Sequence, residues 1–191
     1  MKSASAGEPT PGSLADACEP ADPVAIARTI VLRKLAAAPR TRQQLADVLR
    51  QKQVPETAAE FVLDRFTEVG LIDDGEYACM WVRSRQATKA IARPLLRREL
   101  RQRGVSDELI AAALQQVSDE DETSRAIDLV RRKLAASDRL APEVRYRRLS
   151  GLLARKGYSA AVIATVVRQV LSESPDAGLS DLHDVQISGM I

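Results

Sequence analysis

The chain has 191 residues, of which 45% are hydrophobic and only 3% are aromatic, and its 28 basic and 26 acidic residues give a formal net charge of +2. Its length allows one or two domains, and its many Ala, Leu, Val and Arg residues favour helices over sheets. Two cysteines and one histidine, which lies near the C-terminus, are too few for a disulfide framework or a His/Cys metal cluster. There is no secretory signal and no run of about 18 apolar residues that could span a membrane, so we expect a cytoplasmic protein.

One sequence pattern occurs three times, starting at Leu45, Leu96 and Leu149. In each copy a second Leu follows four residues later, a basic residue follows after seven and an apolar residue after nine. Repetition at a period of roughly 50 residues is typical of an array of similar units that stack on their neighbours. We therefore predict an all-α fold, with three tandem three-helix repeats that form an elongated, curved array.

In the first repeat we predict helices over residues 22–38, 41–53 and 55–69. Pro39 ends the first helix, Thr41 is a good N-cap for the second, and Gly70 follows the third. The residues predicted to face inward in the first helix are Ile26, Ile30, Leu32 and Leu35, and the apolar residues of the third helix are Phe61, Val62, Phe66 and Val69.

In the second repeat a helix is predicted to begin at Asp73, another to run over residues 91–103 and a third to follow the N-cap Ser106. Gly104 ends the second helix of this repeat, and Gly157 does so in the third repeat, where Ser159 is the next N-cap. The first repeat has Gln53 at the glycine position, so a looser turn is expected there.

These patterns divide the chain into five segments. The predicted divisions are a disordered tail at 1–21, three-helix repeats at 22–72, 73–117 and 118–173, and a flexible C-terminal tail at 174–191.

Charge is distributed unevenly along the chain. Residues 83–103 contain eight basic residues and one acid, Glu99. On a helix over residues 91–103, Leu96 and Leu100 share one face, while Arg97, Arg98 and Arg101 lie on the other. Guanidinium groups bind phosphate and carboxylate through paired hydrogen bonds, so such a face suits a polyanion. The residues predicted to bind a partner or nucleic acid are Arg83, Arg85, Lys89, Arg93, Arg97, Arg98, Arg101, Arg145, Arg147, Arg148, Arg155 and Lys156.

Two other kinds of site were weighed. The chain has no phosphate-binding glycine loop and no catalytic triad, and acidic pairs such as Asp73-Asp74 are explained by a helix N-terminus, so we expect no enzyme, metal or cofactor. The second and third helices of each repeat are similar to a helix-turn-helix, but Asp107 and Glu108 begin the third helix where a DNA reader contacts bases. Phe61, Tyr77 and Trp81 lie on apolar helical positions and are expected in the core rather than as base-stacking platforms.

The stretches Gly70-Leu-Ile-Asp-Asp-Gly-Glu-Tyr-Ala78, Trp81-Val-Arg-Ser-Arg85 and Leu96-Arg-Arg-Glu-Leu-Arg-Gln-Arg-Gly-Val105 resemble the RecX family of bacterial recombinase regulators. Leu153-Ala-Arg-Lys-Gly-Tyr158 in the third repeat does so too, and the resemblance covers about residues 24–172.

This resemblance implies a non-enzymatic partner of RecA, acting in DNA recombination, repair and the SOS response. Such a protein lodges in the groove of the RecA–DNA filament, inhibits strand exchange, ATP hydrolysis and RecA-assisted repressor cleavage, and also binds single- or double-stranded DNA. A monomer is expected. Two alternatives stay open, a general nucleic-acid-binding protein without a recombinase partner and an inert helical adaptor.

Overall fold

The computed structural model describes residues 22–134 and 140–173, so the two predicted tails, Cys18 and His183 lie outside the described residues. Within this part the chain forms nine α-helices and no strand. The helices are α1 (Pro23–Ala37), α2 (Arg42–Gln51), α3 (Glu56–Glu68), α4 (Asp74–Lys89), α5 (Arg93–Arg101), α6 (Asp107–Leu114), α7 (Asp119–Leu134), α8 (Pro142–Arg155) and α9 (Ala160–Ser172).

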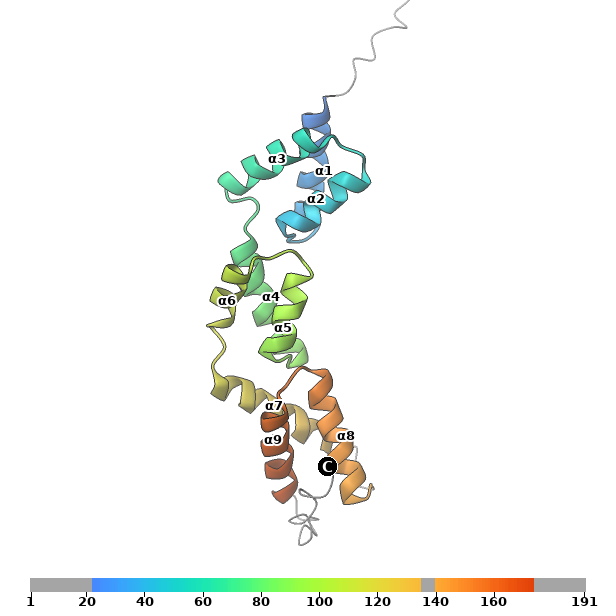
Figure 1. The fold of residues 1–191 in the computed structure, drawn as a ribbon, viewed down its shortest axis with the longest axis vertical. Helices are drawn as coiled ribbons and strands as arrows, with labels where there is room; N and C mark the ends of the chain where they lie inside the picture. The colour runs from blue at the N-terminus through green and yellow to red at the C-terminus, as the bar shows by residue number, and fades with distance from the viewer. Residues whose placement is uncertain (1–21, 135–139, 174–191) are drawn as a thin grey trace, which may run out of the picture.

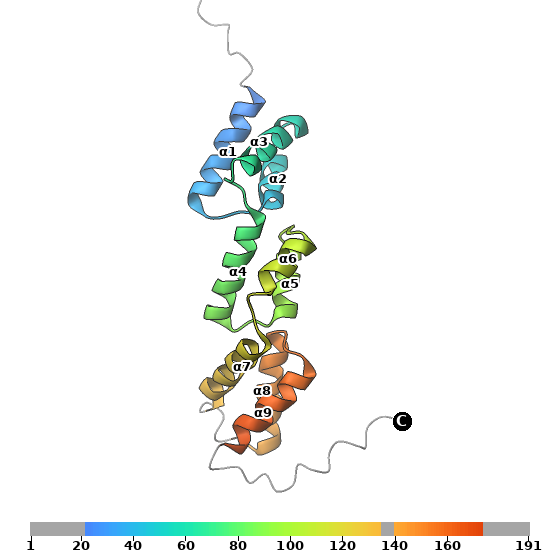
Figure 2. The same ribbon diagram turned by 90° about the vertical axis from the view of Figure 1, so that its left-hand side faces the viewer.

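The nine helices form three groups of three that follow one another along the long axis of the molecule (Figures 1 and 2). Each group has its own cluster of buried apolar side chains, and the closest helix pairs all lie within a group. The prediction of an all-α fold of tandem three-helix repeats is confirmed. Each repeat has a core of its own, and the core of the third repeat also includes Ala90 and Ala92 of the second repeat.

The predicted caps begin the helices where the sequence placed them. Thr41 accepts a hydrogen bond from the main-chain N–H of Gln44, and the Gln44 side chain in turn accepts from the main-chain N–H of Thr41, which completes a capping box. Ser106, Ser118 and Ser159 accept equivalent hydrogen bonds at the starts of α6, α7 and α9. These side chains satisfy N–H groups that the first turn of a helix leaves unpaired.

The turn after Gln53 differs from the prediction. The φ of Gln53 is 58°, which lies in the left-handed region, as do the φ angles of Gly104 (78°) and Gly157 (86°). In all three repeats the apolar residue that follows donates its main-chain N–H to the second Leu of the repeated pattern, as Val54 does to Leu49 over 3.1 Å. The expectation of a looser turn is therefore wrong, because glutamine adopts the conformation that glycine adopts elsewhere, at a cost of about 1–2 kcal/mol.

Two predictions about the first repeat are also wrong. Ile26 and Leu32 are exposed, and α1 instead buries Ala27 and Val31. Phe61, predicted in the core, is 59% exposed on α3, and Val69 is also exposed at the end of that helix. The helix α1 is apolar on more than one side, so periodicity alone did not define its buried face.

Candidate partner- and nucleic-acid-binding surface

The second helices of the three repeats, α2, α5 and α8, lie along one side of the molecule (Figure 1). The N-terminus of α2 contacts the C-terminal end of α5, and the N-terminus of α5 contacts the C-terminal end of α8. The Thr41 hydroxyl donates a hydrogen bond to the main-chain oxygen of Arg103 over 2.6 Å, and the Ala92 main-chain N–H donates to that of Lys156 over 3.0 Å. These are equivalent positions 51 to 53 residues apart in the repeats. We call this row of helices the second-helix column.

The glycine turn of one repeat fits against the second helix of the repeat before it. A Cβ atom on Gly104 would lie 2.3 Å from the Cβ of Gln43, and one on Gly157 would lie 2.6 Å from the Cβ of Leu95. Only glycine allows this approach, so the same residue serves the left-handed turn and the joint between repeats.

A carboxylate from the next repeat binds the first turn of each of the helices α2 and α5. The Arg42 main-chain N–H donates to Asp74 over 2.9 Å, and that of Arg93 donates to Glu122 over 3.2 Å. Burial raises the pKa of Asp74, while the hydrogen bond from the Arg42 main chain acts in the opposite direction. An acid at a helix N-terminus is favourable, and here it also connects two repeats.

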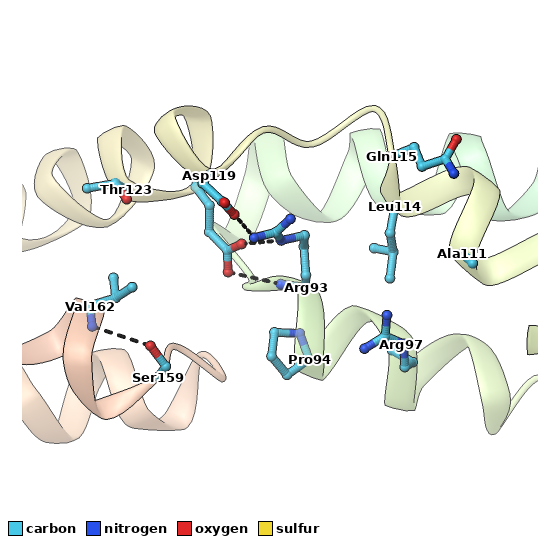
Figure 3. Close-up of a pocket in the computed structure, with 11 residues that line it drawn as sticks. Arg93, Pro94, Arg97, Ala111, Leu114, Gln115, Asp119, Thr123, Ser159 and Val162 are labelled. Atoms are coloured by element: carbon cyan, nitrogen blue, oxygen red, sulfur yellow. Dashed lines mark hydrogen bonds and ion pairs between the residues drawn. The ribbon is translucent and has the colours of Figure 1, made fainter.

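The joint between the second and third repeats has an additional ion pair (Figure 3). The Arg93 side chain contacts Glu122, with Nε 2.7 Å from the carboxylate, and also Asp119. These groups line a cavity of about 550 Å³ between α5, α6, α7 and α9, and Arg97 lies in the same cavity. Arg93 therefore holds two repeats together, and its charge is already compensated.

Three more of the predicted binding residues form ion pairs within the second repeat. Arg83 lies 3.5 Å from Glu76, and Arg85 lies 3.2 Å from Glu99. Arg101 makes two hydrogen bonds with Asp107, of 2.6 and 3.1 Å, and this contact lowers the pKa of the Asp107 carboxyl group. The Arg83–Glu76 and Arg101–Asp107 pairs are exposed, and solvent screens such pairs, so a stronger ligand can displace them. Both side chains of the Arg85–Glu99 pair are only 21% exposed.

Trp81 is the centre of a cluster that joins α4 to α5. The guanidinium carbons of Arg85 and Arg103 lie 4.1 and 3.8 Å from its ring centroid, and its indole N–H donates to Glu99 over 2.8 Å. Tyr77 stacks on the same ring, with centroids 6.0 Å apart. As expected, Tyr77 is buried, and the half-buried Trp81 ring makes intramolecular contacts instead of offering a platform for bases.

The remaining predicted residues differ in exposure. Arg145 is buried and Lys156 is half-buried, while Lys89 is exposed at the end of α4. The exposed arginines of the second-helix column that form no ion pair with any described residue are Arg97, Arg98, Arg147, Arg148 and Arg155. The charge of this subset is not compensated by an ion pair within the described part of the chain.

Sequence reasoning missed how two acids and one arginine are used. Asp119 and Glu122 lie in the first turn of α7, where acids are favourable in any helix, and nothing in the local sequence indicates that they also bind Arg93. Arg103, which is not among the predicted binding residues, contacts Trp81 through its guanidinium group and the first repeat through its main-chain oxygen. The signal that finds these contacts is the repeat itself, since Arg42 and Arg93 occupy equivalent positions.

Residues 22–134 and 140–173 contain no group of His, Cys, Asp or Glu side chains that could hold a metal ion. None of the helices in these ranges is long and apolar enough to cross a membrane.

The fold and surface define a helical repeat protein that presents unpaired arginines along one row of helices. Models of the first, second and third three-helix domains of RecX match residues 27–66, 73–114 and 119–167. The regulatory protein RecX of Streptomyces lividans is 52% identical over 172 residues, which cover 90% of this chain and 92% of that protein. The chain belongs to the RecX family.

Further comparisons agree with this assignment. The regulatory protein RecX of Thermobifida fusca is 50% identical over 152 residues, or 80% of this chain and 82% of that protein. The crystal structure of RecX from Lactobacillus salivarius has a TM-score of 0.71 at 21% identity and covers 78% of this chain and 97% of that chain, which supports the fold. Another crystal structure of a regulatory protein RecX has a TM-score of 0.70 at 27% identity, covering 76% of this chain and 73% of that chain. The family is thus one of regulatory proteins.

Proposed function

We propose that this protein is a non-enzymatic regulator that binds the RecA recombinase filament and DNA. In this proposal it inhibits the recombinase, ATPase and coprotease activities of RecA. Membership of the RecX family supports the RecA partner. The observation that carries the binding surface is the set of arginines on α5 and α8 that remain exposed and without an ion pair among the described residues.

The exposed arginines without an ion pair in the described ranges are only a part of the predicted binding residues, so the proposed binding surface is smaller than the predicted one. Arg97 and Arg98 lie on α5, and Arg147 and Arg148 lie on α8, whose ends meet at the hydrogen bond between Ala92 and Lys156. Their charge therefore extends from the second repeat into the third. A guanidinium without a carboxylate partner binds phosphate or an acidic protein side chain without first breaking an internal ion pair.

The elongated form of the molecule suits a filament as a target (Figure 2). A filament repeats the same surface along its length, so a chain of three repeats contacts several subunits at once. Each contact after the first is intramolecular, and modest individual contacts then give strong binding overall. Hydrogen bonds and ion pairs connect neighbouring repeats, so the arginines of different repeats keep their relative positions.

The test measures ATP hydrolysis by preformed RecA filaments in the presence of excess DNA. We expect the double variant Arg97→Glu/Arg98→Glu to need at least about a tenfold higher concentration for the same inhibition. The reason is that reversing two charges lowers the net charge of the proposed surface by four units. The matched control is Arg28→Glu/Arg33→Glu, which makes the same charge change at exposed positions of α1. Inhibition by a folded Arg97/Arg98 variant at wild-type concentrations would show that the binding surface is assigned incorrectly.

The same exposed arginines also favour a second candidate, a general nucleic-acid-binding protein without a recombinase partner. That protein would bind DNA with a steep salt dependence and would slow RecA only by competing for free DNA. Excess DNA removes such competition. Inhibition that disappears when DNA is added in excess supports the second candidate, and inhibition that persists supports a filament partner.

A further inference from the structure

The third repeat has a large open groove between its second and third helices. It lies between α8 and α9, has a volume of about 940 Å³, and is lined mainly by small side chains. The small residues include Ser150, Gly151 and Ala154 from α8 and Ala160 and Ala164 from α9.

One end of the equivalent surface of the second repeat is covered by an ion pair. Arg101 and Asp107, hydrogen-bonded over 2.6 Å, occupy the positions that Ala154 and Ala160 occupy 53 residues later. Two alanines thus replace two long charged side chains that are joined to each other. Cavities at equivalent positions of the first and second repeats have volumes of about 280 and 550 Å³, so the third repeat differs in the size of its groove and in the small side chains that line it.

Gly151 lies in the interior of α8, where glycine costs about 1 kcal/mol relative to alanine. A Cβ atom there would meet only the Arg155 guanidinium, at 3.4 Å, so the packing of the described chain does not require glycine. Beside it, the Ser150 hydroxyl oxygen is buried and has no hydrogen-bond partner among the described residues. A missing Cβ allows another backbone to approach closely, and an unpaired hydroxyl offers it a hydrogen bond.

One end of the groove is positively charged. Arg147 on α8 and Arg168 on α9 line it, both are exposed, and neither forms an ion pair with a described residue. The turn at residues 156–159 joins the other ends of the two helices, close to Ala154 and Ala160. A segment that binds in the groove therefore needs an apolar face that packs against these small side chains. It also needs carboxylates near the arginine end of the groove.

Residues 179–187 of the same chain have this chemistry. Leu179, Leu182 and Val185 are spaced three residues apart, and Asp181 and Asp184 lie between them. The whole segment 174–191 contains three aspartates and no lysine or arginine. We propose that the groove between α8 and α9 is the docking site for residues 179–187.

The lengths agree with this docking. The groove extends along α9 from Arg168 to Ala160, about 12 Å at 1.5 Å per residue, and nine residues in a helix span about 13 Å. Arg168 lies five residues before Glu173, so the chain leaves α9 at the arginine end of the groove. Pro175 and Gly178 precede the docking segment and favour a reversal of direction. This docking does not depend on the proposed function, because it joins two parts of one chain.

Hydrogen exchange of the full chain, measured by mass spectrometry, tests the proposal. We expect the amides of residues 179–187 to exchange at least about tenfold more slowly than those of an unstructured peptide. The substitution Ala154→Leu fills the groove and should remove this protection, whereas the matched control Ala112→Leu, at an exposed position of α6, should preserve it. Unprotected amides in the wild-type chain, or protection that survives Ala154→Leu, would overturn the proposal.

Three further variants distinguish docking from general stability. Leu182→Asp lies outside the repeats, so it should remove the protection while the melting temperature of the repeats stays within about 2 °C. Gly151→Ala should raise the melting temperature, because alanine favours the helix, and yet reduce the protection. Arg168→Glu should also reduce the protection, unlike Arg132→Glu, a matched exposed position on α7. If Gly151→Ala raises both the melting temperature and the amide protection of residues 179–187, no backbone occupies the groove.

Discussion

The Thr41 hydroxyl lies 2.6 Å from the main-chain oxygen of Arg103, 62 positions further along the chain, and this hydrogen bond joins the first repeat to the second. Thr41 is fully buried and is also the N-cap of α2. One side chain thus begins a helix and fixes the position of the next repeat. The cores of the first and second repeats share no residue, so polar contacts such as this one hold these two repeats together.

We predict that Thr41→Val lowers the free energy of unfolding by about 2 kcal/mol, measured by urea denaturation. Valine keeps the shape of threonine but loses the cap, worth about 1 kcal/mol, and leaves the Arg103 carbonyl without its donor. Thr29→Val is the control, because the exposed Thr29 hydroxyl bonds only within its own helix, to Ala25. Equal effects of the two substitutions would show that the contact between repeats contributes nothing.

The Arg93 contacts give a second prediction about the joints. Glu122→Gln should destabilise the protein by about 1–3 kcal/mol, because the nearly buried Glu122 carboxylate accepts hydrogen bonds from both the main chain and the side chain of Arg93. Asp119→Asn should cost less than about 0.5 kcal/mol, since the side chain of Asp119 is 83% exposed. Thermal denaturation of the two variants makes the comparison, and a larger effect at Asp119 would contradict it.

The left-handed turn of the first repeat leads to a stabilising substitution. Gln53 adopts a φ of 58° at the position of Gly104 and Gly157. We expect Gln53→Gly to raise the free energy of unfolding by about 1 kcal/mol, because glycine has no steric penalty in this region. Gln51→Gly in the neighbouring helix should instead lower it by up to about 1 kcal/mol. A loss of stability in both variants would show that the Gln53 side chain makes a contribution larger than the strain.

How far the sequence predicted the structure depends on the range of the interaction. The caps Thr41, Ser106 and Ser159 act within three residues, so local sequence identified them. The orientation of α5 was also predicted correctly, with Leu96 and Leu100 fully buried, because its apolar and basic residues separate cleanly by helical period.

The candidate surface was harder to predict, because charge pairing depends on contacts between distant residues. Arg93 and Glu122 are 29 residues apart, and nothing in either local sequence indicates their contact. The run from 83 to 103 is basic as a sequence, yet in the fold Arg101 meets Asp107 from the following helix. The sequence predicted which face of α5 is exposed to solvent, but not which of the arginines on that face form ion pairs.

Tyr158 gives a prediction about alkaline pH. Burial and, to a smaller extent, the charge of Glu122 raise its pKa to about 12, against a weaker opposing effect of Arg125. The neutral hydroxyl donates a hydrogen bond to the Ala90 main-chain oxygen over 3.1 Å. Since unfolded tyrosine loses its proton near pH 10, stability is fully present below pH 10 and decreases as the pH rises toward 12.

Tyr158→Phe removes this titration. We expect the variant to be less stable than wild type by about 1 kcal/mol at neutral pH, and the difference to shrink between pH 10 and 12. Urea denaturation across this pH range measures the effect, with Tyr146→Phe, at a half-buried position, as the control. A difference that stays constant with pH would show that Tyr158 ionises equally in both states.

The unpaired arginines predict how salt affects DNA binding. If Arg97 and Arg98 contact phosphates, Arg97→Ala/Arg98→Ala should reduce the slope of log K against log salt concentration by about 1.4 to 1.8, because each phosphate contact releases condensed counterions. Arg101→Ala should change the slope less than either single substitution, since Asp107 already compensates its charge. Arg28→Ala/Arg33→Ala, on exposed positions of α1, should leave the slope unchanged. Fluorescence anisotropy with labelled DNA at several salt concentrations gives the slopes. Equal reductions in the α5 and α1 double variants would mean that positive charge acts over the whole molecule, and that the unpaired arginines of the second-helix column have no special role.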